Sequence, residues 1–390
     1  MKDCPLRMLL AIDSFKESMT SLQAAKAFEQ GIRTVLPQIS IATLLVSDGG
    51  EGFTEAFLHT GKGHRVRTMV TGPLGKRIMA HFGIFDRGKQ AVVELAQASG
   101  LALLKPGERN PMRTSSYGTG ELINAAIQQG VRTITVGIGG SATNDGGIGM
   151  AQALGAIFYN AQGDLIAAPA TGKDLLSIAR IDLSGVRRRL SGVRIAVACD
   201  VANPMTGPRG SSAVYGPQKG ATPAMVRHLD AGLRNLCRVI RKDVGKNIER
   251  MPGAGAAGGI GGGFVAFLGA RLLPGIDTLL DAVGFDSLLA SADLGVTGEG
   301  AIDGQTVNNK APVGVARRAR KRGVPVIAVC GAIGPGAHRV HDQGIGAVYC
   351  ITPGPMSLER AIGSGKKHMT QAGETIGRLL TLLPGMGKGT

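Results

Sequence analysis

The chain of 390 residues has no tryptophan, four tyrosines and an aromatic content of only 4%. Few of its side chains could therefore stack on nucleic-acid bases, and no zinc-finger, RRM or basic-zipper pattern occurs. The formal net charge of +16 comes from basic residues that are scattered over amphipathic segments. We expect no nucleic-acid partner and attribute the charge to a basic surface that serves anionic substrates or reflects the host's proteome.

Cysteine and long apolar runs are also scarce. The five cysteines lie far apart, without a C-x-x-C pair or the spacing of a zinc site, which predicts reduced thiols in a cytoplasmic protein. No run of 18 apolar residues occurs, and the apolar run near the N-terminus is too short for a signal sequence. We therefore expect a protein that is neither exported nor embedded in a membrane.

Glycine, by contrast, is abundant, with 61 residues that gather in short clusters after apolar runs. The most informative cluster lies in residues 131–150, VRTITVGIGGSATNDGGIGM, where a β-branched strand leads into glycines and polar side chains as a helix begins near Gly147. Glycines let the backbone approach a ligand closely, and the free N–H groups of a helix start favour phosphate or carboxylate. The predicted anion-binding residues are Gly139, Gly140, Ser141, Thr143, Asn144 and Asp145.

Two other interpretations of this stretch remain open. One is a strand-to-helix turn with an ordinary Asp or Asn cap. The other is a dinucleotide fingerprint, because Gly137, Gly139 and Ala142 match G-x-G-x-x-A. The acid expected about 20 residues later would be Asp164, which lies in a polar turn and not at a strand end. We therefore favour nucleotide or phosphate binding over NAD.

A second glycine-rich stretch, residues 253–259, matches G-x-G-x-x-G. The segment before it is polar and helical, so the strand that a dinucleotide site requires is missing. We interpret this stretch as a backbone turn or hinge before a helix that begins at Phe264.

The length of the chain and its alternation of strands and helices predict two domains. Residues 64–96 resemble antiparallel hairpins, and the strand 193–198 is followed by an irregular loop of roughly 20 residues, of the kind that is usually functional or disordered. We expect an α/β protein in which a Rossmann-like parallel-sheet domain, residues 1–70 and 290–390, carries an inserted α/β domain with a mixed sheet, residues 71–289. The active site is expected in the cleft between the two domains, because ligands bind at the carboxyl ends of strands.

Acidic, basic and hydroxyl side chains gather at the predicted strand ends. Carboxylates that can hold Mg²⁺, lysines that neutralise phosphate and glycine-rich turns fit phosphoryl transfer, although no Walker motif occurs. Besides the anion-binding residues named above, the candidates are Asp13, Ser14, Lys16, Asp48, Gly49, Gly50, Glu51, Asp200, Asn203, Lys219, Gly298, Glu299 and Asp303.

Several longer segments resemble the type-1 glycerate kinase family over nearly the whole chain. They are DSFKES at 13–18, SDGGEG at 47–52, VTGPLG at 70–75, RNPMRTSSYGTGELI at 109–123, GIGGSATNDGGIGMAQALG at 137–155, ACDVANPMTGPRGSSAVYGPQKGAT at 198–222, PGAGAAGGIGGG at 252–263, VTGEGAIDGQT at 296–306 and PGPMSLE at 353–359. The resemblance implies phosphorylation of D-glycerate by ATP, mostly at the 2-hydroxyl, in a two-domain α/β fold. Asn308 and Asn309 depart from the family pattern.

We assign the roles of the candidates as hypotheses. Lys16 and Ser14 hold an anionic group, and residues 139–145 cradle a phosphate. Asp48 or Asp200 acts as the general base while the other helps to hold Mg²⁺, and Lys219 neutralises charge in the transition state. The expected ligands are ATP, Mg²⁺ and D-glycerate, on a monomer or homodimer. The alternatives are an NAD(P)-dependent oxidoreductase of a small hydroxy acid and a non-enzymatic nucleic-acid binder.

Overall fold

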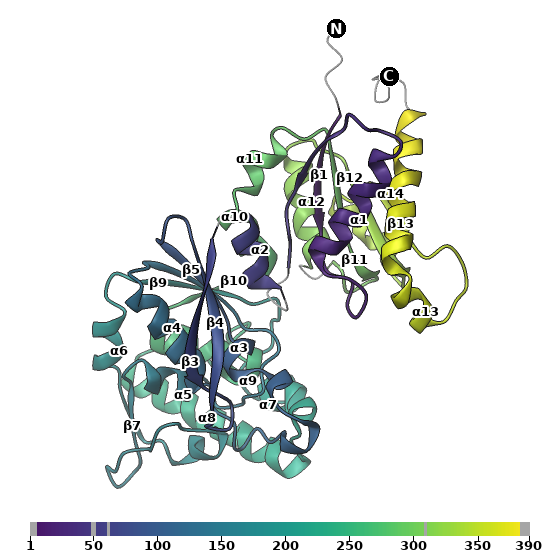
Figure 1. Cartoon of the computed structure of the whole chain (residues 1–390). Helices are drawn as coiled ribbons and strands as arrows, with labels where there is room; N and C mark the ends of the chain where they lie inside the picture. The colour runs from purple at the N-terminus through teal and green to yellow at the C-terminus, as the bar shows by residue number, and fades with distance from the viewer. Residues whose placement is uncertain (1–5, 48–51, 61–62, 308–309, 383–390) are drawn as a thin grey trace. The chain divides into compact units, whose positions relative to one another are not determined.

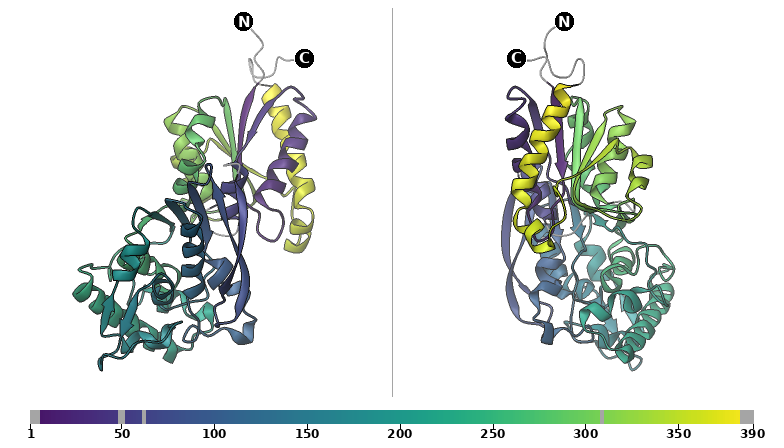
Figure 2. Two further views of the ribbon diagram at one scale, coloured as in Figure 1. Left: turned by 60° about the vertical axis from the view of Figure 1, so that its left-hand side comes forward. Right: turned by 90° about the vertical axis from the view of Figure 1, so that its right-hand side faces the viewer.

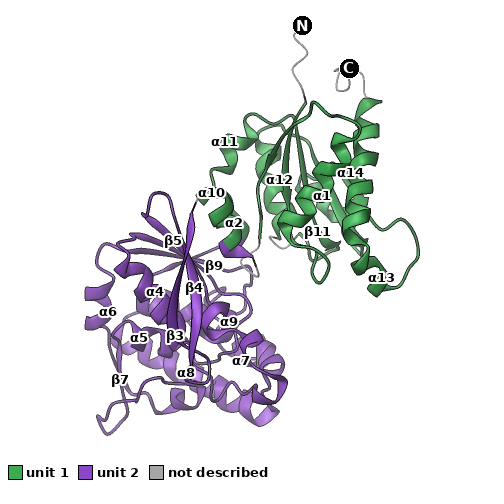
Figure 3. Cartoon of the chain, viewed as in Figure 1, with its two compact units in different colours: residues 1–48, 55–60, 276–390 green, residues 49–54, 61–275 purple. Residues whose placement is uncertain are grey.

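A computed structural model describes residues 6–47, 52–60, 63–307 and 310–382. The chain forms two compact units (Figure 3), one made of Met1–Asp48, Glu55–Thr60 and Ile276–Thr390 and the other of Gly49–Thr54 and Gly61–Gly275. Within the described ranges, no helix combines the length and the apolar character needed to cross a bilayer. The domain limits predicted at residues 70 and 290 stay a prediction.

The first unit is built on a five-stranded sheet in which every neighbouring pair is parallel, in the order β13-β12-β11-β1-β2. Its strands are β1 (Arg7–Ile12), β2 (Ser40–Thr43), β11 (Leu294–Ile302), β12 (Val326–Ile333) and β13 (Ala347–Cys350). Its helices are α1 (Ser21–Arg33), α2 (Phe53–Thr60), α10 (Gly275–Ala282), α11 (Phe285–Leu289), α12 (Ala311–Lys321), α13 (Leu358–Gly363) and α14 (Gly365–Thr381), with a 3₁₀ helix at Ala337–Gln343.

Helices α1 and α14 lie side by side in every view (Figures 1 and 2). Their apolar faces share one hydrophobic cluster with Met8, Leu10 and Ile12, which alternate along β1 and therefore point to the same face of the sheet. Gly31 of α1 lies against the backbone of α14, where a Cβ atom would overlap the carbonyl of Thr370. The capping box predicted at Thr20 and Gln23 is present at the start of α1.

The second unit is built on a six-stranded mixed sheet in the order β10-β9-β6-β5-β4-β3. Four strands are parallel, and β4 and β3 join them as an antiparallel hairpin, as the sequence predicted for residues 64–96. The strands are β3 (His64–Thr71), β4 (Arg77–Phe85), β5 (Gln90–Glu94), β6 (Thr133–Gly137), β9 (Arg194–Ala198) and β10 (Arg271–Leu273), and β7 (Ile157–Tyr159) pairs separately with β8 (Arg180–Asp182). A mixed α/β architecture with one parallel and one mixed sheet is therefore confirmed.

The helices of the second unit enclose its main hydrophobic core. They are α3 (Ala96–Ser99), α4 (Tyr117–Gln128), α5 (Ile148–Ala153), α6 (Ser184–Arg189), α7 (Ser211–Tyr215), α8 (Pro223–Asp243) and α9 (Ala256–Leu268), with 3₁₀ helices at Leu101–Leu103, Pro106–Glu108, Gly172–Ser177 and Pro217–Lys219. Thr222 caps α8 as predicted, with Pro223 at the first helical position.

Two expectations about local structure were wrong. The segment between β9 and α8 is not an irregular loop throughout, because it contains α7 and the 3₁₀ helix Pro217–Lys219. The helix expected from Phe264 starts earlier, since α9 spans Ala256–Leu268, but the turn expected before it is present, because Ala257, Gly258 and Gly259 have left-handed backbone angles that interrupt the helix. Short helices without a sustained apolar period give little signal in a sequence, which explains the first error.

Candidate active site

The loop after β6 carries the residues predicted to bind an anion. Gly139 and Gly140 are exposed, whereas Ser141, Thr143, Asn144 and Asp145 are buried. The helix expected near Gly147 is present as α5, but it has only six residues. Because they are buried, the side chains of these four polar residues lie in the interior of the second unit.

Asp145 holds this loop in place from inside. Its carboxylate accepts hydrogen bonds from the backbone N–H of Ser116 at 2.8 Å, the hydroxyl of Ser116 at 2.7 Å and the N–H of Gly147 at 3.0 Å. Burial raises the pKa of Asp145, while these donors and the N–H of Gly149 act to lower it. Because both oxygens of Asp145 accept hydrogen bonds from the protein, its carboxylate orders the loop.

Lys219 reaches the same loop from the segment between β9 and α8. Its side chain is 1% exposed, and its ammonium donates to Ser141 Oγ and to the carbonyl oxygen of Thr143, both at 2.7 Å. Burial lowers the pKa of Lys219 from its ordinary value of 10.5 to about 7, and the negative charge of Asp145 opposes that shift. A lysine with such a pKa is typical of functional sites.

Buried polar atoms without a partner occur in the loop that Lys219 contacts and in helix α7. Thr143 Oγ1, Asn144 Oδ1 and Ser211 Oγ are buried and have no hydrogen-bond partner in the described part of the chain. Asn144 links the loop after β6 to α7, because its Nδ2 donates to Ser212 Oγ at 3.1 Å, and Ser212 follows Ser211 in the chain. A buried polar atom without a partner costs about 1–3 kcal/mol, so this group of atoms suits a polar ligand.

The loop after β9 brings further candidates to this edge of the sheet. Gly137 at the end of β6 pairs with Ala198 at the end of β9, so the two loops leave the sheet at the same level. Asp200 accepts the N–H of Gly275, the first residue of α10, at 2.9 Å. Asn203 accepts from the Tyr215 hydroxyl at 2.7 Å and donates to a backbone carbonyl at 2.8 Å, so this segment is well ordered.

In the first unit, the other candidates lie at the end of β1, in the second half of β11 and in the loop after β11. Ile12 pairs with Gly298, and the N–H of Asp13 donates to the carbonyl of Gly298 at 2.9 Å. Beyond them lie Ser14, which is partly buried, and Lys16, which is exposed.

Glu299 follows Gly298 within β11, and its carboxylate is already engaged by the protein. Its carboxylate accepts from Thr306 Oγ1 at 2.8 Å and pairs with Lys310 at 3.0 Å. Asp303 accepts the N–H of Gln305 at 2.7 Å within the same loop. The contacts of both carboxylates therefore order this loop.

The predicted residues thus form two groups, each at the carboxyl edge of one sheet. Asp48, Gly49, Gly50 and Glu51 lie outside the described residues. In the rest of the chain, no group of three acidic, His or Cys side chains has the arrangement of a metal site. That the two groups act together in one active site stays a prediction.

Sequence reasoning missed Glu94, the last residue of β5. Its side chain is 8% exposed, it pairs in register with Gly137, and it accepts the N–H of Thr54 at 2.6 Å. A carboxylate that ends an apolar run is a signal that the sequence did offer. Ser116 was missed as well, because only the fold brings it to Asp145.

The second glycine-rich stretch, residues 253–259, packs against the loop after β6. Gly146 N–H donates to the carbonyl of Gly258 at 3.0 Å, and a Cβ atom at Gly258 would overlap the carbonyl of Thr143. The left-handed turn at residues 257–259 therefore lets the two backbones touch. The role observed here is packing of one loop on the other.

We expect Gly258→Ala to lower the free energy of unfolding by about 2 kcal/mol more than Gly245→Ala does. Both glycines have positive φ, at +81° and +75°, but a Cβ at Gly245 meets no atom within 4 Å. The control therefore measures the left-handed strain alone, and the difference measures the overlap with Thr143. Chemical denaturation monitored by circular dichroism gives both values, and equal losses would contradict the tight packing.

Comparison with known proteins shows that this chain is similar to glycerate kinases. The sequence model of the glycerate kinase family matches residues 8–381. A glycerate kinase of Halalkalibacterium halodurans is 47% identical over 95% of this chain and 97% of its own, and a glycerate 2-kinase of Escherichia coli is 41% identical over 97% and 98%. A crystal structure assigned to a glycerate kinase 2 of Salmonella typhimurium LT2 has a TM-score of 0.87 at 43% identity and covers 97% of this chain and 99% of its own.

Proposed function

The chain belongs to the glycerate kinase family, and on that premise we propose that it transfers the γ-phosphoryl group of ATP to the 2-hydroxyl of D-glycerate, giving 2-phosphoglycerate. Its enzyme class is accordingly that of a phosphotransferase with an alcohol acceptor. The observation that carries the proposal is the buried ammonium of Lys219 on the loop after β6, together with three buried oxygens that have no partner within the described residues, Thr143 Oγ1, Asn144 Oδ1 and Ser211 Oγ.

Lys219 and the loop after β6 are proposed to receive anionic oxygens. The ammonium donates to Ser141 and Thr143 through two of its three N–H groups. A phosphoryl or carboxylate oxygen bound beside it would stabilise the protonated lysine and supply partners for the unpaired hydroxyls. In a buried site, such a fixed positive charge stabilises negative charge in the transition state more strongly than it would in water.

Asp200 is proposed as the general base or as a ligand of Mg²⁺, with Asp48 in the complementary role. Mg²⁺ is usually held by one or two carboxylates together with substrate phosphates, so the carboxylate of Asp200 is a fitting donor. The ion would neutralise charge on the phosphates of ATP. Asp200 is partly buried and fixed by the N–H of Gly275, which suits either role.

The first unit is proposed to supply Ser14 and the exposed Lys16 for an anionic group of a substrate. Asp13, Gly298, Glu299 and Asp303 would shape the backbone around them. We further propose that residues 1–70 and 290–390 act as one domain and residues 71–289 as the other. The enzyme is proposed to be cytoplasmic and to work as a monomer or homodimer.

Formation of ADP tests the proposal. Purified protein is incubated with ATP and Mg²⁺, with and without D-glycerate, and ADP is measured. We expect ADP release that depends on both D-glycerate and Mg²⁺. A protein that folds but releases no ADP with D-glycerate would contradict the proposed function.

A further inference from the structure

A surface pocket beside helix α8 is lined mainly by charged and amide residues, none of which has been discussed so far. Its cavity has a volume of about 330 Å³. Arg234, Arg238 and Arg241 occupy positions i, i+4 and i+7 of α8, so their side chains project from one face of the helix. The lining residues are Ala231, Arg234, Asn235, Arg238, Arg241 and Glu249.

The three guanidinium groups retain most of their capacity to donate. Each carries five N–H groups, and in the described part of the chain each makes one hydrogen bond: Arg234 to Asp230 at 2.9 Å, Arg238 to Asn235 at 2.9 Å and Arg241 to Asn247 at 3.1 Å. Glu249 lies 3.6 Å from both Arg234 and Arg241, which gives ion pairs without hydrogen bonds. The pocket therefore presents unused donors and a net positive charge.

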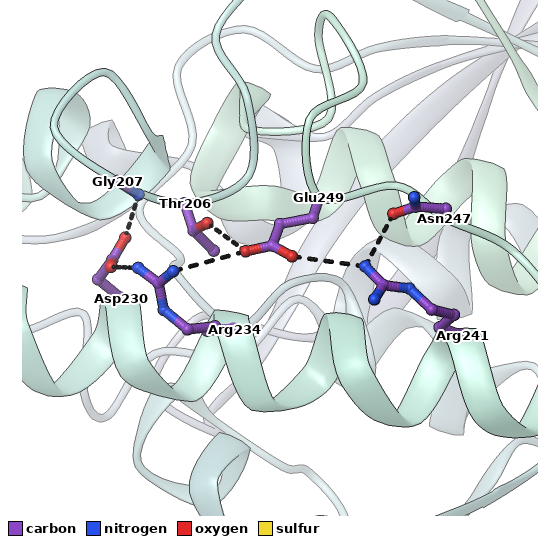
Figure 4. A network of polar contacts seen from close by, with 7 residues as sticks. All are labelled: Thr206, Gly207, Asp230, Arg234, Arg241, Asn247 and Glu249. Carbon is purple, nitrogen blue, oxygen red and sulfur yellow. Dashed lines mark hydrogen bonds and ion pairs between the residues drawn. The ribbon is translucent and has the colours of Figure 1, made fainter.

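Backbone and hydroxyl donors hold the two acidic residues that pair with Arg234 and Arg241, namely Asp230 and Glu249. Thr206 Oγ1 donates to Glu249 at 3.0 Å, and the N–H of Gly207 donates to Asp230 at 2.8 Å (Figure 4). Figure 4 shows Glu249 between Arg234 and Arg241, above the face of α8. Fixing the carboxylates limits the freedom of the guanidinium groups before any ligand arrives, which favours binding.

We propose that this pocket binds a small anion that carries two phosphate groups, or one phosphate and one carboxylate. Guanidinium groups recognise these oxygens through paired N–H donors. Residues 234 and 241 are about 10 Å apart along the helix axis, so two neighbouring anionic groups can each contact an arginine pair that shares Arg238. The cavity has the size of a small-molecule site.

Calorimetric titration with pyrophosphate at low ionic strength tests the site. We expect saturable binding that Arg238→Gln weakens by at least about tenfold, the loss expected for a charged hydrogen-bonding partner. Arg188→Gln is the matched control, because Arg188 is exposed on α6, lies outside the pocket lining and carries the same charge. The control should bind within about twofold of the wild type, since a distant exposed charge is screened by solvent.

Glu249→Gln provides a test of opposite sign. Glutamine can still accept from Thr206 but no longer competes for Arg234 and Arg241, so pyrophosphate should bind about threefold or more tightly. The control is Glu359→Gln, an exposed glutamate of α13 in the first unit, which should leave the affinity unchanged.

Three results would overturn the proposal. The first is the absence of saturable pyrophosphate binding. The second is an equal loss of affinity in Arg188→Gln and Arg238→Gln. The third is a kcat or a KM for ATP that changes in Arg238→Gln in parallel with the affinity for pyrophosphate. The last result would place pyrophosphate at the catalytic site. Since the titration requires no kinase activity, its outcome is independent of the proposed function.

Discussion

Replacement of Lys219 by methionine should lower kcat about 1,000-fold while the protein remains folded. In the proposed role, Lys219 stabilises negative charge that develops in the transition state, and deletion of a single interaction of this kind costs about 100- to 1,000-fold. Methionine has a similar length and is flexible, so it can fill the space of the lysine stem. Steady-state kinetics with ATP and D-glycerate measure the effect, and near-normal turnover would remove Lys219 from the site.

The pH dependence of stability separates the charge of Lys219 from its packing. Its pKa of about 7 in the folded protein lies below the ordinary value of 10.5, so between these values the unfolded chain binds more protons. The wild type should therefore gain stability relative to Lys219→Met as pH rises from about 7 to about 10. Denaturant titrations at pH 6, 8 and 10 measure the difference, and a difference that is constant with pH would contradict the lowered pKa.

Asp200→Asn should lower kcat between about 100- and 10,000-fold, the range expected for loss of a general base. Asparagine keeps an oxygen that can accept the N–H of Gly275, so the start of α10 should remain fixed. The free energy of unfolding should therefore change by less than about 1 kcal/mol. Kinetics and thermal unfolding of the same preparation measure the two effects.

Asp200→Ala is the matched control for this variant. It removes the charge and the acceptor together, so it should lose activity as Asp200→Asn does and also lose about 1 kcal/mol of stability, the usual cost of removing a helix cap. Normal turnover in Asp200→Asn would leave Asp200 with the structural role alone. The sequence makes the same activity prediction for Asp48→Asn.

Much of the fold could be predicted from the sequence, because the period of apolar residues and the turn residues are local signals. The hairpin of residues 64–96, the strand that ends at Gly137 and the capped helix starts at Thr20 and Thr222 are all present. The helix α7 was missed, because five residues are too few for a period to show.

The interior of the candidate site was less predictable, because contacts between distant segments define it. Lys219 was predicted to neutralise phosphate charge, but its burial follows from a fold in which it meets Ser141, 78 positions away. Asp145 was predicted to bind an anion, which stays a prediction, and its partners Ser116, Gly147 and Gly149 could not be read from the sequence. A sequence motif shows which residue types are present, whereas only the packed structure shows which polar atoms are already paired.

Identification of the reaction product tests the central claim most directly. The purified protein is incubated with ATP, Mg²⁺ and D-glycerate, and the product is supplied to enolase with and without phosphoglycerate mutase. Enolase acts directly on 2-phosphoglycerate, so we predict formation of phosphoenolpyruvate without the mutase. Formation of phosphoenolpyruvate only when the mutase is present would show phosphorylation at the 3-hydroxyl and contradict the proposed reaction.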